Sequence, residues 1–346
     1  MRLRRVRARP RLVLAIATLV ICTNAAGAQY PLLPSPRIDP GTVTQDPHLS
    51  GYLSFRETVR RDSSTFTINQ ARLTATVAPA DFAIVKLQGN LAALGRTSGD
   101  TVPGFVLTDA YVQVSPPNGR VALGGLHPAV IIGQFKTPFS LEYLTGFSLL
   151  QTANRSQVVE RLATRRDIGI AAHLAFRDHV ALAGGVLNGE GANTLKNTNG
   201  RQLVVGRLTL IPARGLAVAG KWSGEGGDHR WGYDARWMRN GLVLEGERIE
   251  RDAPVGDDAT QDAAGHYLLA SYQLTRHLQP VVKWEQLRER LVDAGTTSEM
   301  RLTWMTYGLN IMSASRVARL QIDWIVKRDA LVRSPDELVA QLIVIF

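Results

Sequence analysis

The sequence has only one cysteine among its 346 residues and no apolar run of about 18 residues or more. A spanning helix needs about 20 such residues, so a helical membrane protein is excluded. Sustained helical periodicity is also missing. The seven histidines show no H-E-x-x-H spacing, and no G-x-S-x-G, Walker or dinucleotide glycine pattern occurs. We therefore expect no enzymatic activity, no metal site and no cofactor.

The lone cysteine, Cys22, lies in an N-terminal segment that has the three parts of a secretory leader. Six arginines precede a short apolar run at residues 12–21, and Ala26-Gly27-Ala28 offers small residues for cleavage. We expect residues 1–28 to be a signal peptide, whose removal leaves no cysteine for disulfide or thiolate chemistry. Removal also takes away six of the 40 basic residues and none of the 30 acidic ones, so the net charge falls from +10 to about +4. The basic composition is therefore no evidence of nucleic-acid binding.

A proline-rich stretch follows at residues 29–48, and it is expected to form neither a helix nor a central strand. We interpret it as a periplasmic lead-in. Residues 49–346 are then read as one all-β unit of about sixteen strands, because alternating runs recur with turn residues between them. The predicted strands are residues 51–60, 71–77, 85–91, 106–115, 121–135, 167–176, 180–187, 202–211, 216–223, 230–238, 242–249, 267–274, 281–287, 302–311, 317–326 and 338–346.

The two faces of these segments differ in polarity. The last segment carries apolar residues on one face, namely Leu338, Ala340, Leu342, Val344 and Phe346. It ends on the aromatic residue Phe346. A two-domain secreted sandwich is the competing all-β fold. A charged face opposite an apolar, aromatic-flanked face in strand after strand favours a single transmembrane antiparallel β-barrel, in which the last strand pairs with the first. We expect the tryptophans to form an aromatic girdle: Trp222, Trp231, Trp237, Trp284, Trp304 and Trp324.

The connections between strands alternate in length, as expected for tight periplasmic turns and long outer loops. Short links at residues 212–215 and 275–277 contrast with long polar ones at residues 188–200 and 251–265. The longest connection spans the 31 residues 136–166. We expect it to fold inward and narrow the lumen, with an ordinary surface loop as the alternative.

At this connection the sequence becomes similar to a known family. GQFKTPFSLE at residues 133–142 resembles the strand and constriction loop of the phosphate-selective porin O and P family. The resemblance continues in consistent order with DAYV at 109–112, RS at 155–156, RDIGI at 166–170, GVLNGEG at 185–191, LQPVVKWE at 278–285 and GLN at 308–310. It implies a sixteen-stranded barrel, a homotrimer in the bacterial outer membrane, and passive diffusion of small anions through a lumen narrowed by the third outer loop.

Selectivity of such a channel follows the local field of its charged residues. The candidate lumen charges are mixed, with Arg56, Arg72, Lys86, Arg230, Arg236, Lys283 and Arg319 against Asp234, Glu245, Glu247, Glu285 and Asp323. The loop region adds Lys136, Arg155, Arg161, Arg165 and Arg166 against Glu142, Glu160 and Asp167. The candidates for contact with anions are Lys136, Arg155, Arg161, Arg165, Arg166, Arg72, Lys86, Arg236, Lys283 and Arg319.

The mild positive excess makes a preference for anions such as phosphate plausible within a porin that contacts the lipid bilayer and small anionic solutes. Three other functions remain open. A general or weakly cation-selective porin fits the mixed charges. A plugged structural or adhesive barrel predicts no ion conductance, and a barrel hydrolase needs a Ser-His or Asp-His constellation at one rim.

Overall fold

The computed structural model describes residues 31–32, 34–92, 106–117, 125–177, 179–254, 259–293, 296–330 and 334–346. The predicted signal peptide lies outside these residues, as do residues 121–124 of the fifth predicted strand. None of the helices within the described ranges is long and apolar enough to cross a membrane.

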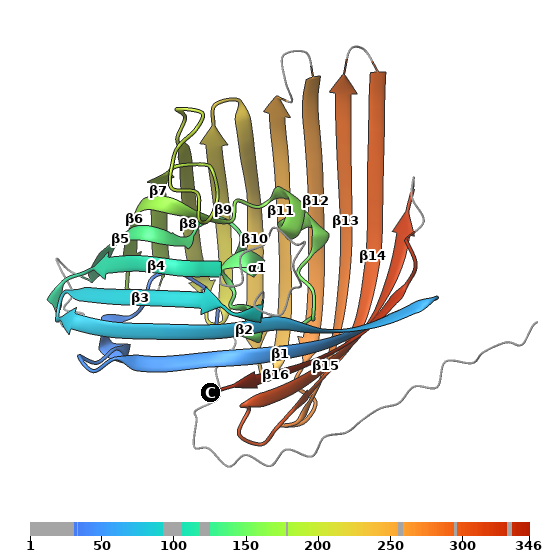
Figure 1. Cartoon of the computed structure of the whole chain (residues 1–346), viewed down its shortest axis with the longest axis horizontal. Helices are drawn as coiled ribbons and strands as arrows, with labels where there is room; N and C mark the ends of the chain where they lie inside the picture. Colours follow the sequence, from blue (N-terminus) through green and yellow to red (C-terminus); the bar gives the residue numbers. More distant parts are fainter. Residues whose placement is uncertain are drawn as a thin grey trace, which may run out of the picture.

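Sixteen antiparallel strands form one closed barrel, in which every strand pairs with its neighbours in sequence (Figure 1). The fold and the strand number predicted from the sequence are confirmed. The strands are β1 His48–Arg60, β2 Ser63–Ala80, β3 Ala83–Asn90, β4 Val106–Val114, β5 Leu126–Lys136, β6 Arg166–Phe176, β7 Val180–Leu187, β8 Leu203–Ala213, β9 Leu216–Glu225, β10 Asp228–Arg239, β11 Leu242–Pro254, β12 Ala259–Tyr272, β13 Leu278–Asp293, β14 Thr296–Met312, β15 Ala318–Asp329 and β16 Glu337–Ile345.

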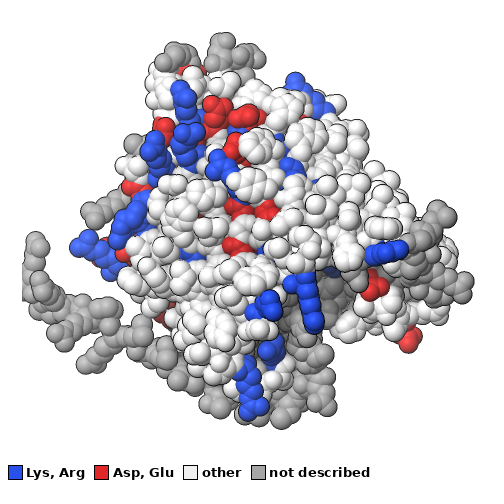
Figure 2. All heavy atoms as spheres, turned by 180° about the vertical axis from the view of Figure 1, so that it is seen from behind, with Lys and Arg blue, Asp and Glu red and all other residues white. Residues whose placement is uncertain are grey.

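The first and last strands close the barrel in a continuous register from Tyr52↔Ile345 to Val59↔Leu338. Side chains alternate between lumen and exterior along each strand, because strand side chains have a period of two. The exterior is apolar, as lipid contact requires: large hydrophobic residues of most strands are exposed there, including Leu53, Leu87, Ile132, Leu182, Leu208, Tyr233, Leu268, Val282, Tyr307, Trp324 and Leu342. Seen from behind, the surface is largely uncharged, with most Lys and Arg toward its margins (Figure 2).

The wall is uneven in height. β13 and β14 have 16 and 17 residues, whereas β3 and β7 have eight each, and the long strands rise beyond the others in Figure 1. β11 and β12 continue their pairing up to Pro254↔Thr260. The predicted long polar loop at residues 251–265 is therefore wrong, because most of it is strand.

One tryptophan departs from the predicted aromatic girdle. Trp304 lies opposite Glu285 on β13 and Lys327 on β15, and both of these side chains face the lumen. Its indole Nε1 donates a hydrogen bond to Asp329 at 2.8 Å, and the ammonium of Lys327 lies 4.4 Å from the ring centroid. Trp304 is thus a lumen residue held by polar partners, which a period-of-two pattern alone does not distinguish from a lipid-facing one.

Candidate functional site

The connection between β5 and β6 folds into the barrel, where it forms three short helical turns: α1 Leu141–Leu144, η4 Phe147–Leu149 and α2 Gln157–Leu162. We call residues 137–165 the constriction loop. Serines begin both α-helical turns: the hydroxyl of Ser140 accepts from Tyr143 N, and that of Ser156 accepts from Val158 N, each at 3.1 Å. Most residues of the loop are buried and only Arg161 and Arg165 are exposed, as expected for a segment inside the lumen rather than on the surface.

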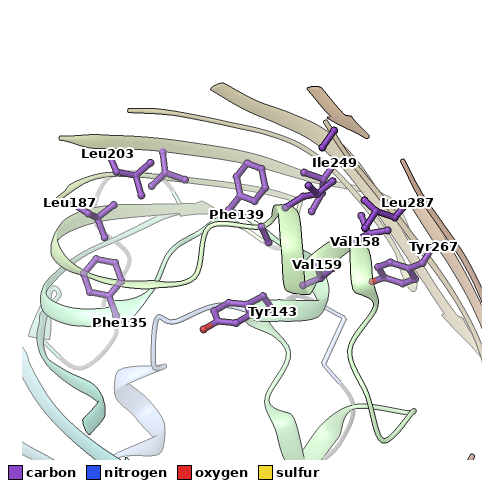
Figure 3. Packing of buried hydrophobic residues seen from close by; sticks show 14 of the residues in the cluster. Phe135, Phe139, Tyr143, Val158, Val159, Leu187, Leu203, Ile249, Tyr267 and Leu287 are labelled. Atoms are coloured by element: carbon purple, nitrogen blue, oxygen red, sulfur yellow. The ribbon is translucent and has the colours of Figure 1, made fainter. Parts of the chain in front are cut away.

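Apolar packing holds one side of the constriction loop against the wall (Figure 3). Val158 and Val159 of α2 are fully buried in a cluster that includes Ile249, Tyr267 and Leu287 on β11, β12 and β13. Phe135, Phe139 and Tyr143 extend the same cluster toward Leu187 and Leu203 on β7 and β8. Burial of such side chains is the main favourable term in packing, so this cluster fixes the apolar side of the loop against β7, β8 and β11–β13.

Three wall carboxylates add polar anchors beneath the loop. Glu247 accepts hydrogen bonds from the Ser140 hydroxyl and from the backbone N–H groups of Leu141 and Glu142, at 3.1 to 3.2 Å. Glu285 accepts from the hydroxyl of Ser156 at 2.7 Å and from the backbone N–H of Gln157 at 2.5 Å. Asp323 accepts from Ala153 N at 2.6 Å. These acidic residues, expected from the sequence to face the pore, are instead covered by the loop.

The remaining acidic side chains on this side of the loop pair with buried cations. Arg207 binds Asp234 through two nitrogens at 2.7 Å each, and Lys221 contacts both Asp234 and Glu247. Arg236, a predicted anion-facing residue, lies fully buried 2.6 Å from Glu245. Lys283, another one, donates to Thr152 Oγ1 at 2.9 Å and to Asn154 O at 2.8 Å. Arg236 and Lys283 therefore help to hold the constriction loop against the barrel wall and do not line the cavity on the other side of the loop.

A cavity of about 1040 Å³ lies on the other side of the loop, between it and the wall formed by β1–β4, β15 and β16. We call it the channel cavity. Ten cationic side chains line it, against three carboxylates, Asp109, Glu160 and Glu337. The cations are Arg37, Arg56, Arg60, Arg72, Lys86, Lys136, Arg155, Arg165, Arg166 and Lys327. The mixed charges of the sequence are thus distributed unevenly in the lumen: carboxylates bind the loop or buried cations on one side, and cations outnumber carboxylates around the channel cavity.

The densest group of charges in the channel cavity surrounds Asp109 on β4. Its carboxylate lies 2.9 Å from the ammonium of Lys86 and 2.6 Å from Nε of Arg166, so one anion is shared by two cations. Arg72 donates only to the amide oxygens of Gln70 and Gln88, at 2.8 and 3.3 Å, and has no salt bridge within the described part of the chain. Its guanidinium charge is therefore uncompensated by a direct partner.

Two cations of the constriction loop region have structural partners as well. The Lys136 ammonium donates to the carbonyl oxygens of Tyr143, Leu144 and Thr145 at 2.7, 3.1 and 3.1 Å. All three of its N–H donors are thereby used at the end of α1. The guanidinium of Arg155 lies over the ring of Tyr143, 5.1 Å from its centroid.

Six of the ten predicted anion-facing residues line the channel cavity: Lys136, Arg155, Arg165, Arg166, Arg72 and Lys86. Four do not. Besides Arg236 and Lys283, Arg161 pairs with Glu289 at 3.2 Å, and Arg319 donates to Ser148 O at 2.6 Å beside a separate small cavity. For all ten residues, contact with anions stays a prediction.

Four lining cations are not among the ten anion-contact candidates: Arg56, which the sequence places in the lumen, and Arg37, Arg60 and Lys327, which it does not single out. Arg60 is the last residue of its predicted strand and Lys327 directly follows its predicted strand, and both have the same side-chain phase as the lumen residues before them, so continuing the alternation to these positions identifies them. Arg37 belongs to the proline-rich stretch, where no periodicity indicates which way a side chain points. No group of three or more potential metal ligands is found in the ranges that the structure describes.

One loop carboxyl has an unusual titration. Glu142 is buried, and burial is the main cause that raises its pKa from 4.5 to about 7, although Lys283 at 3.6 Å acts in the opposite sense. Its Oε2 accepts a hydrogen bond from Ser156 N at 2.7 Å, which joins α1 to the start of α2. A change in the protonation of Glu142 near neutral pH therefore affects the contact between α1 and the start of α2.

Comparison with known proteins agrees with this architecture. The model of the phosphate-selective porin O and P family matches residues 54–215, so the resemblance noted in the sequence is confirmed over that segment. A search of curated proteins gives no match. The family match and the fold support an outer-membrane porin channel, and they imply a channel rather than an enzyme.

Solved outer-membrane barrels share the fold at low sequence identity. The trimer form of in-vitro folded OmpT of Vibrio cholerae has a TM-score of 0.61 and 12% identity, covering 87% of this chain and 99% of that one. The outer-membrane channel DcaP of Acinetobacter baumannii has a TM-score of 0.61 and 10% identity, covering 87% and 97%. An anion-selective porin from Comamonas acidovorans has a TM-score of 0.57 and 13% identity, covering 87% and 99%.

Proposed function

We propose that the protein is a porin through which small solutes diffuse passively with a preference for anions such as phosphate. The observation that carries this proposal is the excess of ten cations over three carboxylates around the channel cavity. Charges on low-dielectric walls raise the local concentration of oppositely charged solutes and lower that of like-charged ones. Ring charge decides the sign of selectivity in channels of this kind.

Several lumen carboxylates lie away from the cations of the channel cavity, which explains how a mildly basic sequence can form an anion-selective channel. The carboxylates Asp234, Glu245, Glu247 and Glu285 are bound to cations, hydroxyls or loop N–H groups outside the cavity, so their charges are locally compensated. Arg56 and Arg72 line the cavity and have no salt bridge in the described residues. The field in the open part of the lumen is therefore positive.

We propose that phosphate is the solute that contacts the cations around Asp109 as it passes through the channel cavity. Lys86 and Arg166 share that single carboxylate, and the charges of Arg72, Arg155 and Arg166 all act on the nearby phenol of Tyr52. An entering oxyanion meets guanidinium groups whose planar N–H pairs match its oxygens. Asp109 shares the cations with the solute, which weakens retention and favours release.

The test is the reversal potential across a planar bilayer under a KCl gradient, followed by titration with inorganic phosphate. We expect an anion-selective current that phosphate reduces in a concentration-dependent manner. A cation-selective or unselective current contradicts the anion preference. Absence of current contradicts a channel and favours a plugged barrel.

We further propose that the chain is exported with residues 1–28 as its leader and assembles as a homotrimer in the outer-membrane bilayer. One barrel of the same fold is described as a trimer. Light scattering on the detergent-solubilised protein tests the assembly, and N-terminal sequencing of the membrane form tests the cleavage site. A monomer mass, or an N-terminus at residue 1, contradicts the respective statement.

A further inference from the structure

The proline-rich stretch contacts side chains of the barrel lumen. We call residues 34–44 the strap. The hydroxyl of Tyr111 donates to Pro36 O at 2.8 Å. The side-chain amide of Gln113 makes a reciprocal pair with Ile38, accepting from its N–H and donating to its carbonyl at 2.7 Å each. Both anchors are buried on the lumen face of β4, so the strap lies inside the end of the barrel where the first strand begins.

Local structure keeps the strap in place. Asp39 begins the short turn η1 Pro40–Thr42, since its carbonyl accepts from Thr42 N at 3.0 Å and its carboxylate accepts from Gly41 N at 3.1 Å. Thr44 O accepts from Ala78 N at 2.9 Å, which ties the strap to the end of β2. The side chain of Ile38 packs against the apolar cluster of the constriction loop. Prolines also lower the number of backbone donors that a segment inside a lumen has to satisfy.

The strap separates two water-accessible spaces. Pro34, Ser35, Pro36 and Arg37 line the channel cavity, and the same four residues line a second cavity of about 590 Å³ that extends toward β5–β8. A solute leaving the channel cavity at this end of the barrel therefore passes along the strap.

We infer that the strap is a fixed part of the pore wall, which narrows the exit opposite the outer loops, and that Arg37 is a specificity-determining residue for anion passage there. The part that concerns Arg37 rests on the proposed anion preference, whereas the narrowing of the exit does not.

The surroundings of Arg37 suit this role. Its backbone N–H donates to Ser35 Oγ at 3.1 Å, and the described residues offer its guanidinium no salt bridge. Asp39 is the carboxylate whose charge acts on it. Partial burial lowers the pKa of Arg37, but a guanidinium with a normal pKa above 12 stays charged at neutral pH.

The first test is Arg37→Gln, measured by reversal potential under a KCl gradient. A unit charge about 7 Å from the ion path, screened by about 0.1 M salt, changes an anion-to-cation permeability ratio by about threefold. We therefore expect Arg37→Gln to lower the ratio by about threefold, with the conductance nearly unchanged. Arg239→Gln, on the exposed end of β10 away from the channel cavity, is the matched control and is expected to leave the ratio unchanged.

A cysteine probe gives the same test with both signs of charge. With Cys22 replaced by serine, Arg37→Cys supplies a single thiol, which is labelled with a sulfonate or an ammonium methanethiosulfonate reagent. We expect the sulfonate to shift the reversal potential toward cation selectivity and the ammonium to restore the wild-type value. Complete labelling, verified by mass, with neither shift overturns the role of Arg37.

The second test releases the strap without changing any charge. Tyr111→Phe with Gln113→Leu removes its two lumen anchors, and Tyr233→Phe with Gln286→Leu makes the same chemical changes on the outer face. We expect a larger and noisier single-channel conductance from the first pair only. Equal conductance in both pairs overturns the narrowing, while a wild-type channel that prefers cations refutes the proposed function and leaves the conductance test valid.

Discussion

Glu285 on β13 is the anchor whose removal tests how the constriction loop is held. It accepts two hydrogen bonds from the start of α2, from the hydroxyl of Ser156 and the backbone N–H of Gln157. Glu289 lies four residues further along the same strand and also binds α2, through the partly exposed Arg161 at 3.2 Å. Glu285→Leu and Glu289→Leu therefore make the same chemical change, and each removes a polar partner of α2. The contact of Glu285 with Ser156 is buried, whereas that of Glu289 with Arg161 is partly exposed to solvent.

The expected magnitudes differ because burial differs. Glu285→Leu leaves two donors without acceptors at a buried site, and each such donor costs about 1–3 kcal/mol. A total of about 3 kcal/mol corresponds to roughly two orders of magnitude in the equilibrium between the docked and the undocked loop. Glu289→Leu removes a solvent-exposed ion pair, which is worth about 0.2–1 kcal/mol, or less than about sixfold. Glu285→Gln keeps an acceptor but loses its charge, so an intermediate effect is expected.

Two measurements report on the loop. We expect trypsin to cut after Arg161 and Arg165 faster when α2 leaves the wall, so the initial cleavage rate follows the undocked population. Single-channel recordings show the same event as brief increases of current. We expect the order Glu285→Leu, Glu285→Gln, Glu289→Leu, wild type in both assays, with heat-dependent gel mobility as the control for an intact barrel. Equal effects of the two leucine substitutions refute the role assigned to burial.

Three further predictions concern single groups. Because the pKa of Glu142 is raised to about 7, docking of the loop is most stable below the ordinary value near 4.5 and weakens as the pH rises through 7, by up to about 3 kcal/mol. Glu142→Gln removes this pH dependence of tryptic cleavage, and a wild-type rate that is flat from pH 5 to 8 contradicts it. Arg72→Gln lowers the anion-to-cation permeability ratio by about threefold, and an unchanged reversal potential excludes Arg72 from the ion path. Lys136→Met leaves the carbonyls of Tyr143, Leu144 and Thr145 without their donor and is expected to lower the thermal midpoint by about 5–10 °C. An unchanged midpoint would show that those bonds are dispensable.

The barrel was largely predictable from the sequence because lipid and water impose opposite demands on the two faces of every strand. All sixteen strands lie where alternation placed them, and β7 has the predicted bounds of residues 180–187. The predictions fell short at the long strands: β13 extends to Asp293 instead of residue 287. Beyond the apolar band the outward residues are charged, as at Arg288 and Arg290, so the alternating signal ends before the strand does.

The division of the lumen was not predictable in the same way. Side-chain alternation places both Glu247 on β11 and Glu337 on β16 in the lumen. Glu247 nevertheless lies beneath the constriction loop, whereas Glu337 lines the channel cavity. Which part of the wall the loop covers depends on packing between Val158, Val159 and strands far away in sequence. Strand periodicity assigns a side chain to the inside, but it carries no information about position around the circumference.

The attachment of the constriction loop also has a consequence for biogenesis. Its polar anchors come late in the chain: Ser156 is bound to Glu285, 129 residues downstream, and Ala153 to Asp323, 170 residues downstream. Contacts of such separation form slowly, because the entropy of closing the intervening chain is lost first. An assembly intermediate that lacks the last strands has the loop without these partners. The part of the loop around Ala153 and Ser156 therefore takes its final position only after β13 and β15 are in place.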